Sequence, residues 1–297
     1  MRVILYSQKS TIETSNYIQI CINELLRYNT TLFVLDNLFK KTRNKITYPK
    51  TINVLRKVTK VNKIDFLICF GGDGTMLKAA HLIGALNIPI TGINTGRLGF
   101  LANIPKQNIS NLITSLYKNK FHISPRSIIK VSTTPKLKKK LFKFALNEVT
   151  VSGQNHLSMI SINTYVNKEF LNTYWGDGLI VSTPTGSTAH SLSCGGPIVM
   201  PDSNNFIITP ISSHNLNVRP LILSDSNQIQ IHLDKRFKSF DLSIDGQTEK
   251  ITNKHVVHIQ KENFKINLLV TEKNNYFDTL RNKLLWGLDK RNIEPGL

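Results

Sequence analysis

The sequence predicts an α/β fold plus an all-β fold in one chain: an N-terminal open, Rossmann-like parallel sheet with helices, then a C-terminal antiparallel β-sandwich. The length of 297 residues suits two domains. Short apolar runs alternate with helical periods up to about residue 123, after which long helical periods disappear. With 40% hydrophobic and 19% charged residues, a disordered chain is excluded, and no apolar run reaches the length of a membrane span.

The first domain, residues 1–123, is expected to carry the parallel sheet. Residues 64–70 are almost continuously apolar, as in a strand covered on both faces. The pattern predicts strands at 3–6, 31–35, 64–70 and 88–93, and helices at 11–27, 76–86 and 109–117. This strand–helix alternation is typical of a parallel sheet with helical crossovers.

The second domain, residues 124–275, is expected to form the sandwich. Turns rich in Gly, Asn, Asp and Ser separate segments that alternate apolar and polar residues. Strands are predicted at 128–133, 141–151, 159–166, 178–182, 206–210, 228–233, 240–244 and 255–260. The tail, 276–297, begins with helical spacing and is expected to pack back on the first domain.

The chain is strongly basic, with 38 Lys and Arg against 19 Asp and Glu, a net charge of +19. Three explanations stay open: compositional drift toward Lys and Asn, a field that attracts phosphorylated ligands, or nucleic-acid binding. No nucleic-acid-binding signature accompanies the charge, so we expect no specific nucleic-acid partner and no membrane partner. Cys21, Cys69 and Cys194 lack metal-ligand spacing and predict reduced thiols in the cytoplasm.

The sharpest motif runs from Gly71 through Gly72, Asp73 and Gly74 to Thr75, between a buried strand and a helix. Glycines there let a ligand approach the backbone, and a helix N-terminus suits phosphate. The motif is neither a Walker A loop nor a dinucleotide fingerprint. A carboxylate beside phosphate indicates a base for a hydroxyl nucleophile, or a ligand for a divalent cation that bridges phosphates.

Three further segments carry polar groups suited to a nucleotide. Asn147 and Glu148 stand inside an apolar segment, where an amide and a carboxylate could meet ribose hydroxyls. Residues 175–197 are dense in Gly, Ser and Thr, and no G-x-S-x-G motif supports a serine hydrolase there. Residues 92–101 form a second glycine-rich loop after a predicted strand, and Asp245-Gly246-Gln247 predicts a tight turn.

In this order and spacing, the segments resemble the motifs of the NAD kinases. The resemblance covers the chain from about residue 64 to the C-terminal helix. The loop at 71–74 alone is shared with diacylglycerol, sphingosine and phosphofructokinase-type enzymes, so the combination carries the resemblance. A lipid or other small-molecule kinase with this loop, and a non-catalytic dinucleotide sensor, are the alternatives.

The resemblance implies ATP-dependent phosphorylation of the 2′-hydroxyl of the adenosine ribose of NAD, giving NADP. Asp73 would accept the proton of that hydroxyl, and Gly71, Gly72, Gly74 and Thr75 would border the ATP phosphates. Mg²⁺ would bridge phosphates, and the enzyme would be a homodimer or homotetramer with sites built partly across subunits. The implied NAD-binding residues are Asp73, Gly74, Lys78, Asn147, Glu148, Asp177, Thr188, Ala189, His190, Ser191, Leu192, Ser193 and Gln247.

Two positions depart from the family pattern. Trp175 precedes Gly176 and Asp177 where many bacterial relatives have a basic or polar pair, and His190 replaces the commoner Tyr. The sequence leaves open ATP or polyphosphate as donor, NAD or NADH as acceptor, the oligomeric state and feedback by NADPH.

Overall fold

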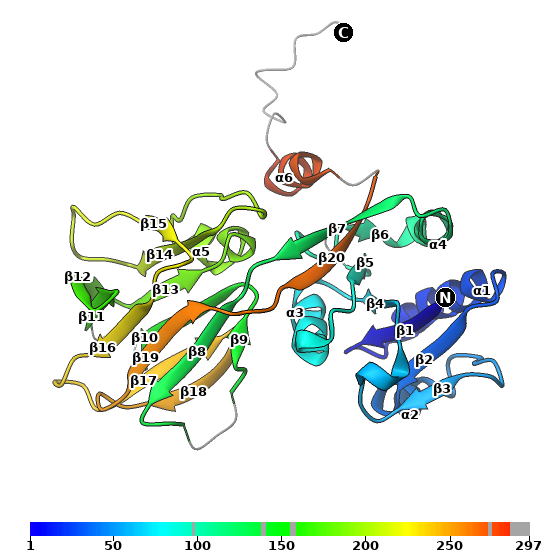
Figure 1. Cartoon of the computed structure of the whole chain (residues 1–297), viewed down its shortest axis with the longest axis horizontal. Coiled ribbons are helices and arrows are strands. Elements are labelled where there is room, and N and C mark those ends of the chain that lie inside the picture. Colours follow the sequence, from blue (N-terminus) through cyan, green and yellow to red (C-terminus); the bar gives the residue numbers. More distant parts are fainter. Residues whose placement is uncertain (97–98, 138–140, 155–158, 273–274, 286–297) are drawn as a thin grey trace, which may run out of the picture. The chain divides into compact units, whose positions relative to one another are not determined.

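The computed structural model describes residues 1–96, 99–137, 141–154, 159–272 and 275–285. The chain divides into two compact units (Figure 1). Unit 1 contains Met1–Ser124 and Asn267–Leu297, and unit 2 contains Pro125–Ile266.

Unit 1 is built on a mainly parallel sheet, as the sequence predicted. Within the described residues the sheet has eight strands in the order β3-β2-β1-β4-β5-β20-β7, and β6 also pairs with β5. The strands are β1 (Arg2–Ser7), β2 (Thr31–Leu35), β3 (Asn53–Leu55), β4 (Phe66–Phe70), β5 (Ile90–Asn94), β6 (Ile104–Pro105), β7 (Phe121–Arg126) and β20 (Ile266–Thr271). Every residue of β4 from Leu67 to Phe70 is buried, which explains its apolar sequence.

Of the helices described, the first four connect strands of the sheet and the last follows β20. They are α1 (Ile12–Leu26), α2 (Asp36–Thr42), α3 (Asp73–Ile83), α4 (Ile109–Tyr117) and α6 (Tyr276–Leu284). Thr11 caps α1 by accepting a hydrogen bond from the backbone N–H of Thr14. The negative charge of Asp73, in the first turn of α3, interacts favourably with the dipole of that helix. One core includes Val3, Leu5, Ile68 and Phe70 of the sheet and Ile18, Ile22 and Leu25 of α1.

Unit 2 is an antiparallel β-sandwich. Within the described residues one sheet, here sheet C, runs β15-β14-β13-β10-β17-β18, and the other runs β12-β11-β16-β19-β8-β9. Their strands are β8 (Ile129–Thr134), β9 (Phe144–Ala145), β10 (Glu148–Gly153), β11 (Ile160–Val166), β12 (Glu169–Gly176), β13 (Gly178–Ser182), β14 (Asn205–Ile211), β15 (Leu221–Ser224), β16 (Ile229–Leu233), β17 (Phe240–Ile244), β18 (Gln247–Ile251) and β19 (Val256–Lys261). A short helix, α5 (His190–Ser193), follows a 3₁₀ turn at Thr185–Thr188.

The inner faces of the two sheets share one core. Val149, Val151, Leu179 and Val181 of sheet C meet Ile162, Ile231 and Val257 of the other sheet. Glu148 and Ser182 are register partners, and so are Thr150 and Ile180, on the outer face of sheet C. This outer face is also buried at Thr150, Ile180 and Ser182.

Two predicted boundaries differ from the structure. The predicted sandwich runs to residue 275, yet β20 pairs in parallel with β5 of unit 1 through Leu268 and Ile90. Leu268 and Leu269 are neighbours in β20 and both are buried, as in a strand that is covered on both faces. At the C-terminus, α6 ends at Leu284 and is followed by Leu285 in the left-handed conformation, while residues 286–297 of the predicted tail lie outside the described residues.

Among the described residues, no helix combines the length and the hydrophobicity needed to cross a membrane.

Candidate active site

Asp73 is the first residue of α3, and its carboxylate accepts three backbone hydrogen bonds from a single segment. Oδ2 accepts from the N–H of Phe100 at 2.9 Å, and Oδ1 accepts from the N–H groups of Leu101 at 3.0 Å and Ala102 at 2.9 Å. A carboxylate offers about four lone-pair positions, two on each oxygen. One position on Oδ2 is therefore left for a proton from a hydroxyl group.

The second glycine-rich loop holds this carboxylate in place. A Cβ added to Gly99 would lie 1.9 Å from Asp73 Oδ1, so only glycine allows this approach. Asn94, at the end of β5, braces the loop by donating from Nδ2 to the carbonyl of Ala102 at 3.0 Å. The sequence placed the two loops at one sheet edge, and the structure shows that one positions the carboxylate of the other. Arg97 and Leu98 lie outside the described residues.

The predicted phosphate loop is open at its tip. Gly72 and Gly74 are exposed, and a Cβ at either position would meet no described heavy atom within 4 Å. Thr75 is buried against Gly71. Lys78 is exposed one turn further along α3, on the same unit as Asp73. The start of the helix thus offers accessible backbone, the helix dipole and a nearby cation to an anion.

Asn147 and Glu148 lie in unit 2, where the structure corrects one expectation. The sequence predicted a single strand over 141–151, but the chain bends at Leu146 and Asn147, between β9 and β10. The bend forms because the N–H groups of residues 146–148 bond to the side chain of Asp245, not to a neighbouring strand. Asn147 therefore lies in the bend, and Glu148 is the first residue of β10.

Unpartnered polar atoms gather around this bend. Asn147 Oδ1 and Glu148 Oε2 are buried and have no hydrogen-bond partner within the part of the chain that the structure describes. The same holds for the hydroxyls of Ser182, which pairs with Glu148 across sheet C, and of Thr185 three residues later. Buried polar atoms without partners are costly. A ligand with several hydroxyl groups would satisfy them.

The Glu148 carboxyl is held in its acid form at neutral pH. Burial raises its pKa to about 8; the nearby Asp245 carboxylate also raises the pKa, and the hydrogen bond donated by the His190 backbone N–H opposes both effects. Because the backbone of His190 makes this contact, the exchange of Tyr for His at that position leaves it intact. A protonated carboxyl can donate as well as accept hydrogen bonds.

Gly186 packs directly on the bend, which gives a first prediction. A Cβ there would lie 2.1 Å from the carbonyl oxygen of Asn147 and 2.8 Å from its Cα. Gly186→Ala is expected to displace Asn147, to destabilise the protein by about 1–3 kcal/mol and to weaken binding of the hydroxyl-bearing ligand about tenfold. Thermal unfolding and ligand titration measure both effects. Unchanged values in both would show that the bend tolerates the shift.

The segment 188–193 is only partly available to a ligand. Ser191 is fully buried, and its hydroxyl is 2.8 Å from that of Thr209, behind the segment. Thr188 donates to the carbonyl of Thr185 at 3.2 Å. Ala189 and Leu192 are half-buried, and His190 and Ser193 are exposed. The segment therefore contacts the Asn147–Glu148 bend through the backbone N–H of His190. The Ser191 hydroxyl instead contacts Thr209.

Asp177 lies away from this bend. It stands between β12 and β13, whereas Glu148 pairs with Ser182 at the other end of β13. At about 3.4 Å per residue, five residues of strand separate the two ends by about 17 Å. Thr150 and Ile180, which lie between them on the outer face, are buried. The structure therefore does not bring Asp177 and Glu148 of one chain into contact with each other.

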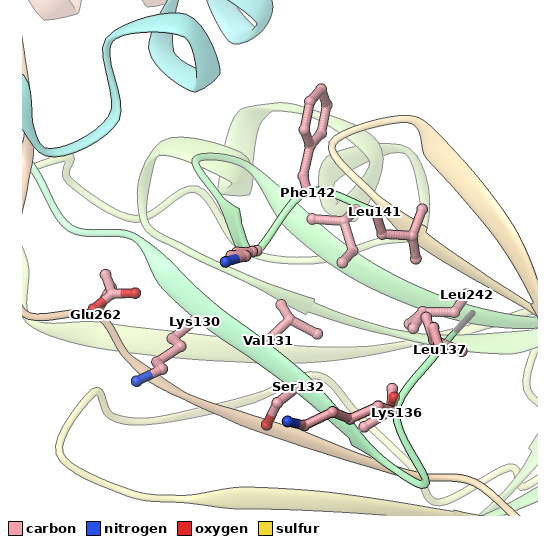
Figure 2. Close-up of a pocket in the computed structure, with 12 residues that line it drawn as sticks. Lys130, Val131, Ser132, Lys136, Leu137, Leu141, Phe142, Leu242 and Glu262 are labelled. Carbon is pink, nitrogen blue, oxygen red and sulfur yellow. The ribbon is translucent and has the colours of Figure 1, made fainter. Parts of the chain in front are cut away.

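Gln247 is exposed at the start of β18, and its Oε1 accepts a hydrogen bond from the N–H of Phe142 at 2.7 Å. Phe142 also borders a cavity of about 500 Å³ in unit 2 (Figure 2). The cavity walls are mainly apolar, with Lys130 and Lys136 among the polar groups, and none of the predicted site residues lines the cavity. This cavity is therefore separate from the predicted site.

Sequence reasoning missed three residues that shape the bend. Asp245 accepts three backbone hydrogen bonds, Thr183 donates from Oγ1 to the carbonyl of Leu146 at 2.6 Å, and Gly186 packs against Asn147. Asp245 drew attention only as part of a turn, because Asp-Gly is the ordinary sequence of a tight hairpin. Thr183 and Gly186 carried no separate signal within a long run of small residues.

Comparison with known proteins gives a consistent result over both units. The profile of the ATP-NAD kinase N-terminal domain matches residues 9–121, and that of the ATP-NAD kinase C-terminal domain matches residues 146–271. An NAD kinase of Cytophaga hutchinsonii is 47% identical over 247 residues, which cover 83% of this chain and 84% of the relative. An NAD kinase of Christiangramia forsetii is 40% identical over 296 residues, 98% of this chain and 100% of the relative.

Two solved structures share the fold. Yeast NADH kinase in complex with NADH superposes with a TM-score of 0.84 at 22% identity, covering 97% of this chain and 88% of that one. An NAD kinase from Archaeoglobus fulgidus in complex with ATP gives a TM-score of 0.72 at 24% identity, covering 96% and 99%.

Proposed function

The chain belongs to the ATP-NAD kinase family, and from this membership we propose which of its residues carry out the phosphorylation of NAD. The protein is an NAD kinase, a phosphotransferase that converts NAD to NADP with ATP as the donor. This assignment favours the NAD kinase over the lipid kinase and the sensor that the sequence left as alternatives. The carboxylate of Asp73, with one lone-pair position left on Oδ2, carries the proposal for the chemistry.

Asp73 acts as the general base. Its Oδ2 takes the proton of the ribose 2′-hydroxyl as the hydroxyl oxygen forms a bond to the γ-phosphorus of ATP. The bond between that phosphorus and the β–γ bridging oxygen breaks, and ADP leaves with the electron pair. The three backbone N–H groups from Phe100 to Ala102 fix the carboxylate, so little reorganisation accompanies the transfer.

The start of α3 binds the phosphates. The exposed Gly72 and Gly74 admit the phosphate chain to the helix N-terminus, where the dipole favours negative charge. Lys78 supplies a cation one turn away. The high net charge of +19 supports attraction of polyanionic substrates to the chain.

The bend at Asn147 and Glu148 binds the adenosine ribose of NAD. The unpartnered Asn147 Oδ1 and Glu148 Oε2 are matched by ribose hydroxyl groups, which both donate and accept hydrogen bonds. Ala189, His190 and Leu192 would border the same ligand, and His190 already donates its backbone N–H to Glu148.

Mg²⁺ fits this site as part of the nucleotide substrate. Across the described residues, no group of three His, Cys, Asp or Glu side chains is placed to hold a metal ion. Mg²⁺ needs few protein ligands when phosphates supply oxygens, and it neutralises phosphate charge in the complex. We therefore infer that the ion enters bound to ATP.

A second copy of the chain completes the site through Asp177. Asp177 and Glu148 of one chain lie about 17 Å apart along β13, with the buried Thr150 and Ile180 between them. A neighbouring subunit can bring its own Asp177 to the nicotinamide side of the ligand. Trp175, two residues earlier, is 52% exposed and offers an apolar surface for such a contact. The enzyme is thus a homodimer or homotetramer.

Subunit complementation tests this arrangement. Glu148→Ala and Asp177→Ala each remove one half of every site, so each variant alone should have low NAD kinase activity. Co-expressed chains form hybrid dimers that contain one intact site, and activity should return to about one quarter of the wild-type value. Hybrid oligomers that are isolated and remain as inactive as the single variants would contradict a shared site.

We infer a cytoplasmic location from the cysteines. Cys21, Cys69 and Cys194 are all free thiols, and burial raises the pKa of the Cys69 thiol well above its usual value. Free, unreactive thiols suit a reducing compartment.

A further inference from the structure

One carboxylate accepts all three backbone N–H groups of the bend that presents Asn147 and Glu148. Asp245 Oδ2 accepts from the N–H of Leu146 at 2.7 Å, and Oδ1 accepts from the N–H groups of Asn147 at 2.9 Å and Glu148 at 3.2 Å. Hydrogen bonds to a charged acceptor are stronger than neutral ones. Three consecutive N–H groups that converge on one side chain fix the direction of the chain at this point.

The Asp245 side chain is itself set by a tight hairpin. Asp245 joins β17 to β18 with φ of +46°, and Gly246 follows with φ of +79°. This left-handed turn suits Asp, Asn and Gly, which limits the residues that the position tolerates. Asp245 is half-buried, and its backbone N–H donates to the carbonyl of Glu148 at 3.1 Å.

The opposite side of the bend is held by the chain after β13. Thr183 donates from its N–H to the carbonyl of Asn147 at 2.9 Å and from Oγ1 to the carbonyl of Leu146 at 2.6 Å. The three N–H groups of the bend thus depend on the Asp245 carboxylate, and the carbonyls of Leu146 and Asn147 depend on Thr183. Without the Asp245 carboxylate, one whole side of the bend loses its partners.

We propose that Asp245 is a positioning residue for NAD: its carboxylate fixes the backbone of residues 146–148 so that Asn147 and Glu148 meet the ribose together. The inference rests on the proposed role of Asn147 and Glu148 in binding the ribose. Asp245 has a second effect through its charge, because a negative group beside Glu148 favours the acid form of the Glu148 carboxyl. Among the described residues, the Cys194 thiol and the backbone N–H of His190 also face Glu148.

The charge effect gives a readout that simple loosening of the structure would not produce. NAD carries phosphates, so ionisation of Glu148 adds a repulsive charge to its site. In the wild-type enzyme, KM for NAD should rise as the pH passes through about 8. Removing the Asp245 charge lowers the pKa of Glu148, so the rise in KM should begin at lower pH.

Asp245→Asn is the test variant, because Asn tolerates the left-handed turn and keeps the side-chain shape. Its amide group opposes at least one of the three N–H donors. We expect KM for NAD to rise about tenfold, kcat at saturating NAD and KM for ATP to change little, and the pH midpoint to fall. Asp241→Asn is the matched control: Asp241 lies on β17, the strand that leads into the Asp245 turn, and accepts from Gln154 Nε2 at 3.1 Å, so NAD kinetics should not change.

Asp245→Gly is the second variant, because Gly also adopts the required φ and removes both the acceptor and the charge. It should give the same fall in midpoint and a larger increase in KM. A folded Asp245 variant that keeps the wild-type KM for NAD would overturn the inference, because the three N–H groups of the bend would then not need the carboxylate to present Asn147 and Glu148.

Asn147→Ala separates this inference from its premise. If Asn147→Ala raises KM for NAD while both Asp245 variants keep wild-type kinetics, the ribose role stands and the positioning role of Asp245 is wrong. If Asn147→Ala also leaves KM unchanged, the ribose assignment itself fails.

Discussion

Asp73→Asn is expected to lower kcat by about 10²- to 10⁴-fold, because the 2′-hydroxyl then has no carboxylate to take its proton. Asparagine keeps one oxygen for the N–H groups of Phe100, Leu101 and Ala102, and the charge and the proton acceptor are lost. Affinity for NAD should change little, since Asn147 and Glu148 of unit 2 are proposed to hold the ribose and are unchanged in this variant. Steady-state kinetics with equilibrium binding of NAD separate the two quantities.

The control for this variant is Asp65→Asn. Asp65 also lies in unit 1, is exposed, and accepts a backbone hydrogen bond from Arg2 at 2.7 Å. Its replacement should leave kcat unchanged. If Asp73→Asn retained turnover within about tenfold of the wild type, the role of Asp73 would be limited to holding the segment from Phe100 to Ala102.

Glu148→Ala is expected to raise KM for NAD by about 10- to 100-fold, because the ribose loses a group that can donate and accept hydrogen bonds. KM for ATP should stay near the wild-type value. The measurement is the initial rate as a function of NAD at fixed, saturating ATP, near neutral pH, where Glu148 is in its acid form.

Glu169→Ala serves as the control, since Glu169 is exposed at the start of β12 in the same unit. Its KM for NAD should equal that of the wild type. Equal increases of KM for NAD and for ATP in Glu148→Ala would point to general damage of unit 2, and an unchanged KM for NAD would remove Glu148 from the ribose site.

The sequence was sufficient for the fold class and for the location of Asp73. Buried strands such as β4 have continuous apolar sequences, and the glycine run before α3 is explained poorly by a simple helix cap. The membership of β20 in the parallel sheet was missed, because the prediction assigned residues up to 275 to the sandwich and gave no strand to Leu268 and Leu269. Which strand β20 pairs with depends on contacts between residues far apart in the sequence, and local periodicity does not reveal such contacts.

The chemical surroundings of the site were harder to predict than its residue types. Asp73 accepts hydrogen bonds from the N–H groups of Phe100, Leu101 and Ala102, and Asp245 accepts them from residues 146–148. Both sets of hydrogen bonds join chain segments that meet only after folding. The bend at Asn147 contradicts the predicted strand, because side-chain acceptors replaced strand pairing there. Ser191 has a residue type suited to ligand binding, yet its hydroxyl is used internally against Thr209.

The most direct measurement is NADP formation by the purified chain supplied with NAD, ATP and Mg²⁺, detected with an NADP-specific dehydrogenase. We predict one NADP for each ADP released, and no signal when ATP or NAD is omitted. Parallel reactions with polyphosphate in place of ATP, and NADH in place of NAD, define the donor and the acceptor. Folded protein that forms no NADP under any of these conditions would contradict phosphoryl transfer to NAD at the site built around Asp73.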